Sequence, residues 1–254
     1  MKACISRVTV TSCLILVLIS LFSCEDAGEK ECECVCDCGD EDDDDGADDD
    51  AGLDDDLDRS ICDSASGGFS NVFTNPYAAF DEGNQWILEG MENFEQVRER
   101  ITVLSRTEVI SGVTALAVES RKWVANELTE VSYRYFAQAS DETVCYFGKD
   151  VDKYNYGSVI GHEGAWKAGE GGASSGIYIP GSPEVGMTFR HFNAPGVGLE
   201  DAEITDMDGS YSTPAGSFNE VMTLSVTTLS GGKLTRKYAY GEGMIVDQAK
   251  ELTE

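Results

Sequence analysis

Apolar and polar residues alternate over several short stretches of this chain, and this spacing of two is the feature that most restricts its fold. In residues 96–103, the side chains of Val97, Ile101 and Val103 lie on one face of an extended strand, and Glu99 is the single exception on that face. A helix would show a spacing of about 3.6 residues instead. The pattern predicts an all-β fold.

Turn-forming residues separate these alternating stretches. Residues 111–112 (Ser-Gly) and 231–232 (Gly-Gly) are pairs of this kind, and they lie between runs rich in β-branched and aromatic residues. Short strands joined at such spacings favour an antiparallel meander that forms a sandwich or a partly open barrel. Only two segments, 122–128 and 247–254, also suit short helices.

Acidic residues set the lower boundary of the predicted folded part. The segment 40–58 contains runs of four, three and three consecutive aspartates and almost no apolar residues. Such a segment buries too little apolar surface to offset its chain entropy, which predicts a disordered, extended tether. We therefore expect a disordered linker over 24–68 and one β-rich globular domain over 69–254.

The charge of the chain excludes one class of partner. Its formal net charge is −29, of which −13 belongs to residues 59–254, with 28 acidic and 15 basic residues. A protein that binds nucleic acid needs a basic patch to contact the phosphates. We therefore expect no nucleic-acid partner.

The first twenty-three residues have the layout of a bacterial secretory signal. Lys2 and Arg7 precede an apolar stretch of fifteen residues, 8–22. At about 1.5 Å per residue, this stretch is too short to cross a hydrocarbon core of about 30 Å, so a transmembrane anchor is the weaker interpretation. Residues 1–23 are predicted to be a cleaved signal peptide, and the protein is predicted to be exported.

The predicted cleavage point lies just before Cys24. The sequence Leu21-Phe22-Ser23-Cys24 resembles the bacterial lipobox, and the resemblance implies that Cys24 is acylated and becomes the membrane anchor. Because one acyl chain binds a bilayer only weakly, stable anchoring takes more than one. Glu25, directly after the cysteine, favours the outer membrane over the inner membrane. The lipid bilayer is therefore the first expected partner.

Six cysteines follow Cys24. Four of them alternate with other residues in the predicted linker: Cys32, Cys34, Cys36 and Cys38. Clustered thiolates suit a soft metal such as Cu(I) or Zn(II), but zinc sites usually place two pairs far apart, so disulfides are the default for this run. By elimination, Cys62 and Cys145 are candidates for a disulfide, although sequence alone does not establish connectivity. No cofactor is expected.

Aromatic residues concentrate between residues 123 and 166. Four of them are candidates for lining a ligand groove: Trp123, Tyr135, Tyr146 and Trp166. Aromatic-lined grooves suit sugars or apolar ligands, so a glycan or an envelope protein is the partner that such a groove would bind. The competing interpretation is an ordinary β-sheet core, which also favours aromatic residues.

Two patterns raise the alternative of a hydrolase that acts on envelope polymers. Residues 172–176 satisfy G-x-S-x-G, but that motif needs a strand before the serine and a helix after it, and a glycine run and β-forming residues stand there instead. His162, Glu163 and His191 are the remaining candidates for base or metal chemistry. They must share a cleft for this function to hold, and no catalytic residue is assigned.

The C-terminal part resembles a known group of proteins. Residues 213–218 (Thr-Pro-Ala-Gly-Ser-Phe) and 237–246 are similar to the t-P-A-G-t-F turn and the Y-a-P-G-v-G-l-V ending of an uncharacterised family of exported bacterial β-rich proteins, and the likeness covers about 75–253. The resemblance implies a β-rich envelope protein without an assigned activity. Arg190 and His191 stand where the family tends to carry Gln and Glu.

These features together predict a membrane-anchored bacterial lipoprotein whose β-domain binds a ligand or an envelope partner. Two alternatives stay open, namely the hydrolase and a metal-binding role for the alternating cysteines. The sequence places the expected activity in the β-rich domain, which the tether would hold away from the bilayer.

Overall fold

The structure, a computed structural model, describes residues 59–254. The predicted signal peptide, the lipidated Cys24, the cysteines of segment 32–38 and the acidic run 40–58 lie outside the described residues. Within residues 59–254, no helix has the length and hydrophobicity needed to cross a membrane.

The prediction of an all-β fold is confirmed. The described residues form fourteen strands and two short 3₁₀ helices. Their bounds are η1 (Ser60–Cys62), η2 (Ser64–Ser66), β1 (Gln85–Glu92), β2 (Glu95–Ile110), β3 (Val113–Val124), β4 (Glu127–Gln138), β5 (Val144–Asn155), β6 (Ser158–Gly161), β7 (Trp166–Lys167), β8 (Gly176–Ile179), β9 (Thr188–Ala194), β10 (Gly198–Thr213), β11 (Gly216–Thr228), β12 (Lys233–Ala239), β13 (Gly243–Asp247) and β14 (Lys250–Leu252).

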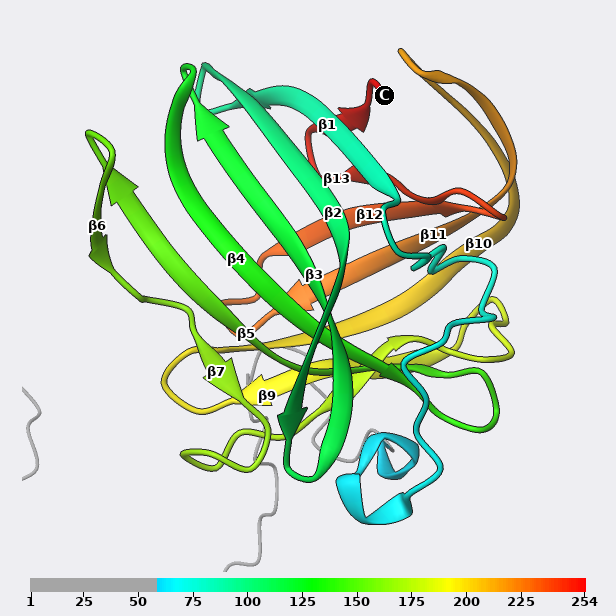
Figure 1. Cartoon of the computed structure of the whole chain (residues 1–254). Coiled ribbons are helices and arrows are strands. Elements are labelled where there is room, and N and C mark those ends of the chain that lie inside the picture. Colours follow the sequence, from blue (N-terminus) through cyan, green and yellow to red (C-terminus); the bar gives the residue numbers. More distant parts are fainter. Residues whose placement is uncertain (1–58) are drawn as a thin grey trace, which may run out of the picture. The chain divides into compact units, whose positions relative to one another are not determined.

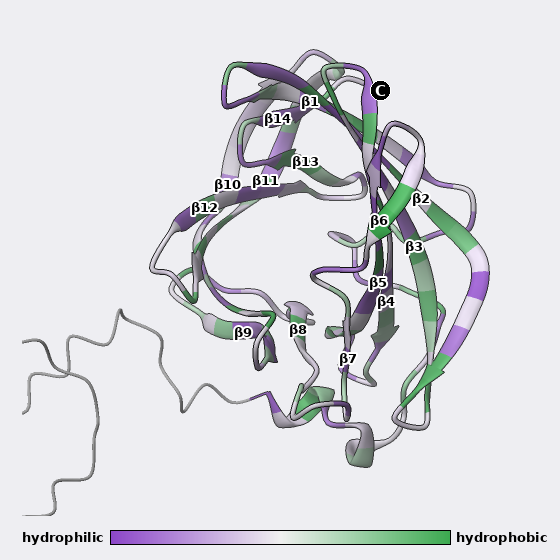
Figure 2. Cartoon of the chain, turned by 90° about the vertical axis from the view of Figure 1, so that its left-hand side faces the viewer, coloured by the Kyte–Doolittle hydropathy of each residue, from purple (hydrophilic) through white to green (hydrophobic). Residues whose placement is uncertain are grey.

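The strands form one antiparallel sheet that is not closed into a barrel. Its order is β6-β5-β4-β3-β2-β1-β14-β13-β12-β11-β10-β9, and β7 and β8 add to β5 (Figure 1). The sheet curves so strongly that β2–β5 face β10–β12 across the interior (Figure 2). An isolated bridge between Ser174 and Asn193 links the segment before β8 to β9, so the two ends of the sheet approach each other there.

Both segments that also suited helices are extended instead. Residues 122–128 contain the end of β3, a two-residue turn at Ala125 and Asn126, and the start of β4. Near the C-terminus, β14 pairs with β1, where Leu88 lies opposite Leu252. Pairing with a neighbouring strand satisfies the backbone of these short segments, which an isolated helix of this length does not achieve as well.

The packed domain begins earlier than the predicted boundary at residue 69. Cys62 in η1 is fully buried and forms a disulfide with Cys145 in β5, with an S–S distance of 2.03 Å. The hydroxyl of Ser175 donates a hydrogen bond of 2.7 Å to the Cys62 carbonyl oxygen. The disulfide considered from the sequence is therefore present, and it draws residues assigned to the linker into the domain.

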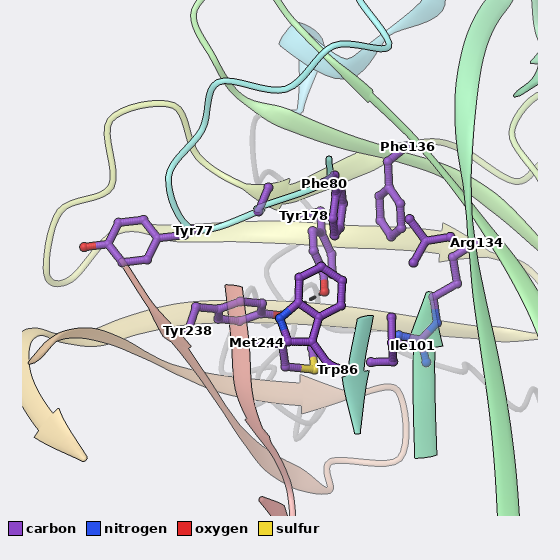
Figure 3. A pocket seen from close by; sticks show the side chains of 11 residues that line it. Tyr77, Phe80, Trp86, Ile101, Arg134, Phe136, Tyr178, Tyr238 and Met244 are labelled. Atoms are coloured by element: carbon purple, nitrogen blue, oxygen red, sulfur yellow. Dashed lines mark hydrogen bonds between the residues drawn. The ribbon is translucent and has the colours of Figure 1, made fainter. Parts of the chain in front are cut away.

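The segment between η2 and β1 packs over the inner face of the sheet. The ring of Phe80 lies 5.0 Å from that of Phe136 and 6.3 Å from that of Trp86, measured between centroids. Asn75 is buried and donates to the Pro180 carbonyl oxygen at 2.9 Å. These contacts make the segment part of the core and close off an apolar cavity of about 20 Å³ (Figure 3).

Candidate functional site

A network of ion pairs crosses the inner face of the curved sheet. Six charged residues and one histidine form it: Glu99 (β2), Arg134 (β4), His191 (β9), Glu200 (β10), Arg236 (β12), Asp247 (β13) and Lys250 (β14). These residues come from distant parts of the sequence. Because each inward position of a β-strand normally carries an apolar residue, so many charges on the inner face need a specific explanation.

Glu99 anchors one end of the network. Its side chain is 5% exposed, and it accepts hydrogen bonds from Ser120 Oγ at 2.6 Å and from Arg134 Nη2 at 3.3 Å. The ammonium of Lys250 donates to its second carboxylate oxygen. Burial alone would raise the pKa of Glu99, but Lys250 and Arg134 outweigh it and hold that pKa below the ordinary value. The apolar pattern of β2 is thus broken at a residue that is buried and fully paired.

Asp247 and Arg236 extend the network from Lys250 to Glu200. Asp247 lies 2.8 Å from Lys250 Nζ and 3.3 Å from Arg236 Nε. Burial raises the pKa of Asp247, whereas Lys250 and Arg236 lower it, and the balance is a pKa of about 2. Arg236 Nη1 also donates to Glu200 Oε2 at 2.8 Å. Burial again opposes the charge of Glu200, and Arg236 lowers its pKa well below the ordinary range.

A β-bulge in β5 aims two side chains into the interior. The register of β4 against β5 pairs Arg134 with Lys149 and Phe136 with Tyr146, which leaves one extra residue of β5 between them. Tyr146 and Lys149 therefore share a face, although residues three apart on a regular strand point to opposite faces. Gly148, with φ +142°, lets β7 approach, because a Cβ atom there would lie 2.5 Å from the Trp166 carbonyl oxygen.

A second bulge, in β9, places His191 on the inner face. Glu200 is paired with Phe192 and Asp201 with Arg190, so His191 is the unpaired residue between them. A bulge of this kind turns two neighbouring side chains of one strand toward the same side. His191 and Phe192 both line the interior as a result.

A cavity of about 90 Å³ lies between this network and a group of aromatic rings. Arg134, Arg236 and Asp247 line it together with the rings of Phe136, Tyr146, Tyr178 and Phe192. On one side it adjoins the apolar cavity of Figure 3, with which it shares Arg134 and Phe136. It also shares Lys149, Phe192 and Glu200 with a more open pocket of about 460 Å³, which we call the mouth.

Lys149 carries a positive charge but has no counterion within residues 59–254. It lines both the cavity and the mouth, and its ammonium makes no ion pair or hydrogen bond within the part of the chain that the structure describes. Its direct cross-strand neighbour is Arg134, another cation. Burial lowers the pKa of Lys149, and Arg134 lowers it further. The ammonium of Lys149 is therefore a half-buried cation beside the cavity without a counterion in the described residues, an arrangement that suits an anionic ligand.

His191 offers a second unpartnered polar atom. Its side chain is 2% exposed, and Nε2 is buried without a hydrogen-bond partner in residues 59–254. Nδ1 lies 3.1 Å from Arg236 Nη1, which can only donate, and 3.4 Å from Glu200 Oε2. The shorter contact favours the tautomer in which Nε2 carries the proton. Since burial lowers the pKa of His191, the ring is neutral at pH 7 and presents an N–H group.

The structure separates the four aromatic residues expected to line one groove. Tyr146 and Trp166 do lie together, with ring centroids 5.0 Å apart, and Tyr146 lines the cavity. Tyr135 instead donates a hydrogen bond of 2.6 Å to Asp150, a residue outside the cavity. Trp123 lies in a separate surface pocket, with Arg98 5.5 Å above its ring. The groove of four aromatic residues is therefore wrong as a single site, and only its central part remains.

The hydrolase patterns do not converge on a site. His162 has a side chain 70% exposed and pairs with Asp152 at 2.9 Å, whereas His191 is buried in the cavity, which neither His162 nor Glu163 lines. The serine of the G-x-S-x-G motif, Ser174, is held by a backbone bridge and is followed by a strand. In residues 59–254, no three side chains capable of ligating a metal gather in one place.

Sequence reasoning missed most of the cavity. It singled out His191 and noted Glu99 as an exception, but Lys149, Arg134 and Arg236 gave no signal beyond their charge. Comparison of the chain with models of protein families, with curated proteins and with solved structures finds no match. The geometry of the cavity therefore has to carry the functional argument.

Proposed function

We propose that this protein is an exported, lipid-anchored binding protein whose β-domain takes a small molecule into the cavity inside the curved sheet. One observation carries the proposal: Lys149 and His191, which each have a polar group without a partner in the described residues, line a cavity that opens to solvent. Native structures leave few buried polar groups unsatisfied. Ligand sites combine apolar walls with a few such groups.

The sequence supports the anchoring part of the proposal. The signal-like segment 1–23, the lipobox-like residues before Cys24 and the resemblance to an exported family all suggest the same location. Glu25 favours the outer membrane. In this proposal the acyl chains bind the bilayer while the β-domain binds its ligand away from it.

Ligand binding is tested on the full chain with a neutral fluorescent probe, N-phenyl-1-naphthylamine. We expect its fluorescence to rise saturably when it enters the mouth of the cavity. Val197, which lines the mouth and is 43% exposed, is replaced by Trp to narrow the entrance, and this variant should bind the probe about tenfold more weakly. Val185→Trp, at an exposed position outside the mouth, is the matched control. Equal binding by both variants would refute a ligand site in the cavity.

Anchoring is tested separately in a bacterial host. Labelled palmitate should enter the wild-type protein, which should sediment with membranes, whereas Cys24→Ser should remain unlabelled and appear in the soluble fraction. Palmitate in the Cys24→Ser protein, or none in the wild type, would overturn the lipoprotein assignment without touching the cavity.

A further inference from the structure

We infer that the ligand is a monocarboxylate with an apolar body, whose carboxylate binds Lys149 and His191 and whose body lies along the apolar mouth of the cavity. This inference rests on the binding function proposed above and names the chemical class of its ligand. Charge, hydrogen-bonding capacity and the shape of the cavity each support it independently.

The charges around the cavity leave one positive charge unmatched. Three carboxylates and three cations of the ion-pair network compensate one another: Glu99, Glu200 and Asp247 with Arg134, Arg236 and Lys250. Lys149 is a fourth cation. Two further charges that act on it, Glu130 and Lys153, pair with each other. One carboxylate therefore neutralises the site, whereas a dianion such as phosphate would bring an uncompensated charge into the interior.

The pairing of Lys149 with Arg134 makes the empty site unfavourable. Like charges directly opposite each other on neighbouring strands destabilise a sheet. Burial and Arg134 both lower the pKa of Lys149, which is the response of an ammonium that lacks an anion. A carboxylate beside Lys149 offsets the repulsion and favours the charged amine.

His191 supplies the second hydrogen bond. With Nδ1 contacted by the guanidinium of Arg236, its Nε2 carries the proton, and it has no acceptor in the described residues. A carboxylate has two oxygen atoms and accepts from two donors at once. If one oxygen accepts from the ammonium and the other accepts from Nε2–H, both groups have a partner. An alcohol or an amine would be a weaker partner for these two groups.

The shape of the cavity determines where the apolar body lies. Inward from the carboxylate position, the space is about 90 Å³ and lined by charges, and the apolar cavity beyond it is only about 20 Å³. A body as large as an octyl chain or a naphthyl ring does not fit there. Outward, the mouth of about 460 Å³ is lined by Phe192, Val197 and Leu229, and Leu229 is 61% exposed. The carboxylate therefore enters first, and the body covers these exposed side chains.

The test uses isothermal titration calorimetry of the full chain with four probes. Octanoate carries both features, octan-1-ol lacks the charge, octylamine reverses it, and acetate lacks the body. We expect octanoate to bind at least about tenfold more tightly than each of the others. Competition with N-phenyl-1-naphthylamine shows whether octanoate occupies the mouth.

Two variants assign the carboxylate to its partners. Lys149→Met should weaken octanoate binding about tenfold or more while leaving octan-1-ol unaffected, because it removes a charge-assisted hydrogen bond. Lys153→Met removes the same charge from the same strand but outside the cavity, and it should change the affinity for octanoate by less than about twofold. His191→Gln keeps a donor in place, whereas His191→Leu removes it, so only the second should lose affinity.

The outcomes separate this inference from the proposed function. Equal binding of octanoate and octan-1-ol, unchanged by Lys149→Met, would overturn the carboxylate while leaving a neutral ligand in the cavity. If acetate binds as tightly as octanoate, the apolar body is wrong. If inorganic phosphate, titrated in the same way, binds as tightly as octanoate, the single charge is wrong. If neither the four probes nor the fluorescent probe binds, the binding function itself fails.

Discussion

At the scale of single residues, the interior of this domain depends on carboxylates that remain ionised although they are buried. Asp247 sits between Lys250 and Arg236, and Glu200 pairs with Arg236. Desolvation of each carboxylate is offset by cations at hydrogen-bond distance. Removing one charge from such a network leaves its partners buried without compensation, so the network is sensitive to each of its members.

Replacement of Asp247 by Asn tests this sensitivity. Two cations, Lys250 and Arg236, then face a neutral amide, and we expect the free energy of unfolding in urea to fall by about 3 kcal/mol. Asp152→Asn, which breaks the exposed pair with His162, should cost less than about 0.5 kcal/mol. If the two variants have equal stability, the interior network does not stabilise the fold.

The depressed pKa values also predict a dependence of stability on pH. Asp247 has a pKa of about 2 in the folded state and an ordinary value of 3.8, so its contribution, on the order of 2 kcal/mol, is complete above pH 4 and is lost as the pH falls toward 2. The pKa values of Glu99 and Glu200 are lowered too and add losses of the same sign. Urea unfolding at several pH values between 7 and 2 measures this decline. Asp247→Asn should decline less steeply, and an equal decline would contradict the assignment.

At the scale of strands, the site depends on irregular pairing. The bulges of β5 and β9 place Lys149 and His191 on the inner face, and a shift in the pairing of β12 with β13 aligns Arg236 with Asp247. In each case one extra residue in a strand changes the face that later side chains take. Lys149, His191 and Arg236 therefore take their places through irregular pairing, whereas Glu99 reaches the interior on a regular stretch of β2.

The bulge of β5 is tested by replacing Gly148 with Ala. The residue has φ +142°, and the added Cβ atom would lie 2.5 Å from the Trp166 carbonyl oxygen, so we expect a loss of about 2–3 kcal/mol in the free energy of unfolding. Gly216 has a similar φ of +154°, and an added Cβ atom would have no neighbour within 4 Å. Gly216→Ala should therefore lower the free energy of unfolding by only about 1 kcal/mol. Equal losses would show that the close approach of β7 is not required.

At the scale of the whole molecule, one covalent link ties the start of the domain to the middle of its sheet. Cys62 and Cys145 are separated by 83 residues, and both are fully buried. The link restricts the unfolded chain across a long loop and holds η1 against β5. It also explains why the domain begins before the predicted boundary.

Reduction of this disulfide should therefore lower stability by up to about 4 kcal/mol in the loop-entropy description. Urea unfolding with and without dithiothreitol measures the difference. The double variant Cys62→Ala/Cys145→Ala lacks this disulfide and should therefore show no further effect of the reductant. It retains the four cysteines of segment 32–38. A reductant effect that persists in the double variant would assign the loss to those other cysteines.

Deletion of residues 40–58 tests the tether that the sequence predicts. Because this segment has almost no apolar residues to bury, its removal should leave the melting temperature of the β-domain unchanged. Differential scanning calorimetry of the full chain and of the shortened chain makes the comparison. A clear drop in melting temperature would mean that the acidic segment stabilises the fold.

The class of the fold follows from the amino-acid sequence alone. Alternation in stretches such as 96–103 and glycine turns such as 231–232 are local properties, because the backbone of a strand sends successive side chains to opposite faces whatever the rest of the chain does. The same local pattern marked Glu99 as an exception. It did not reveal the reason, since the Lys250 ammonium that binds Glu99 lies 151 residues away in the sequence.

The order of the strands and the content of the interior, in contrast, depend on contacts between distant parts of the chain. A strict period of two puts Tyr146 and Lys149 on opposite faces, and the bulge that unites them exists only because β4 and β5 pair in that register. Likewise, His191 Nε2 is unpaired because no side chain that surrounds it in the described residues accepts its hydrogen bond. Burial and pairing are properties of neighbours in space, and the sheet brings those neighbours from seven strands into one cavity wall.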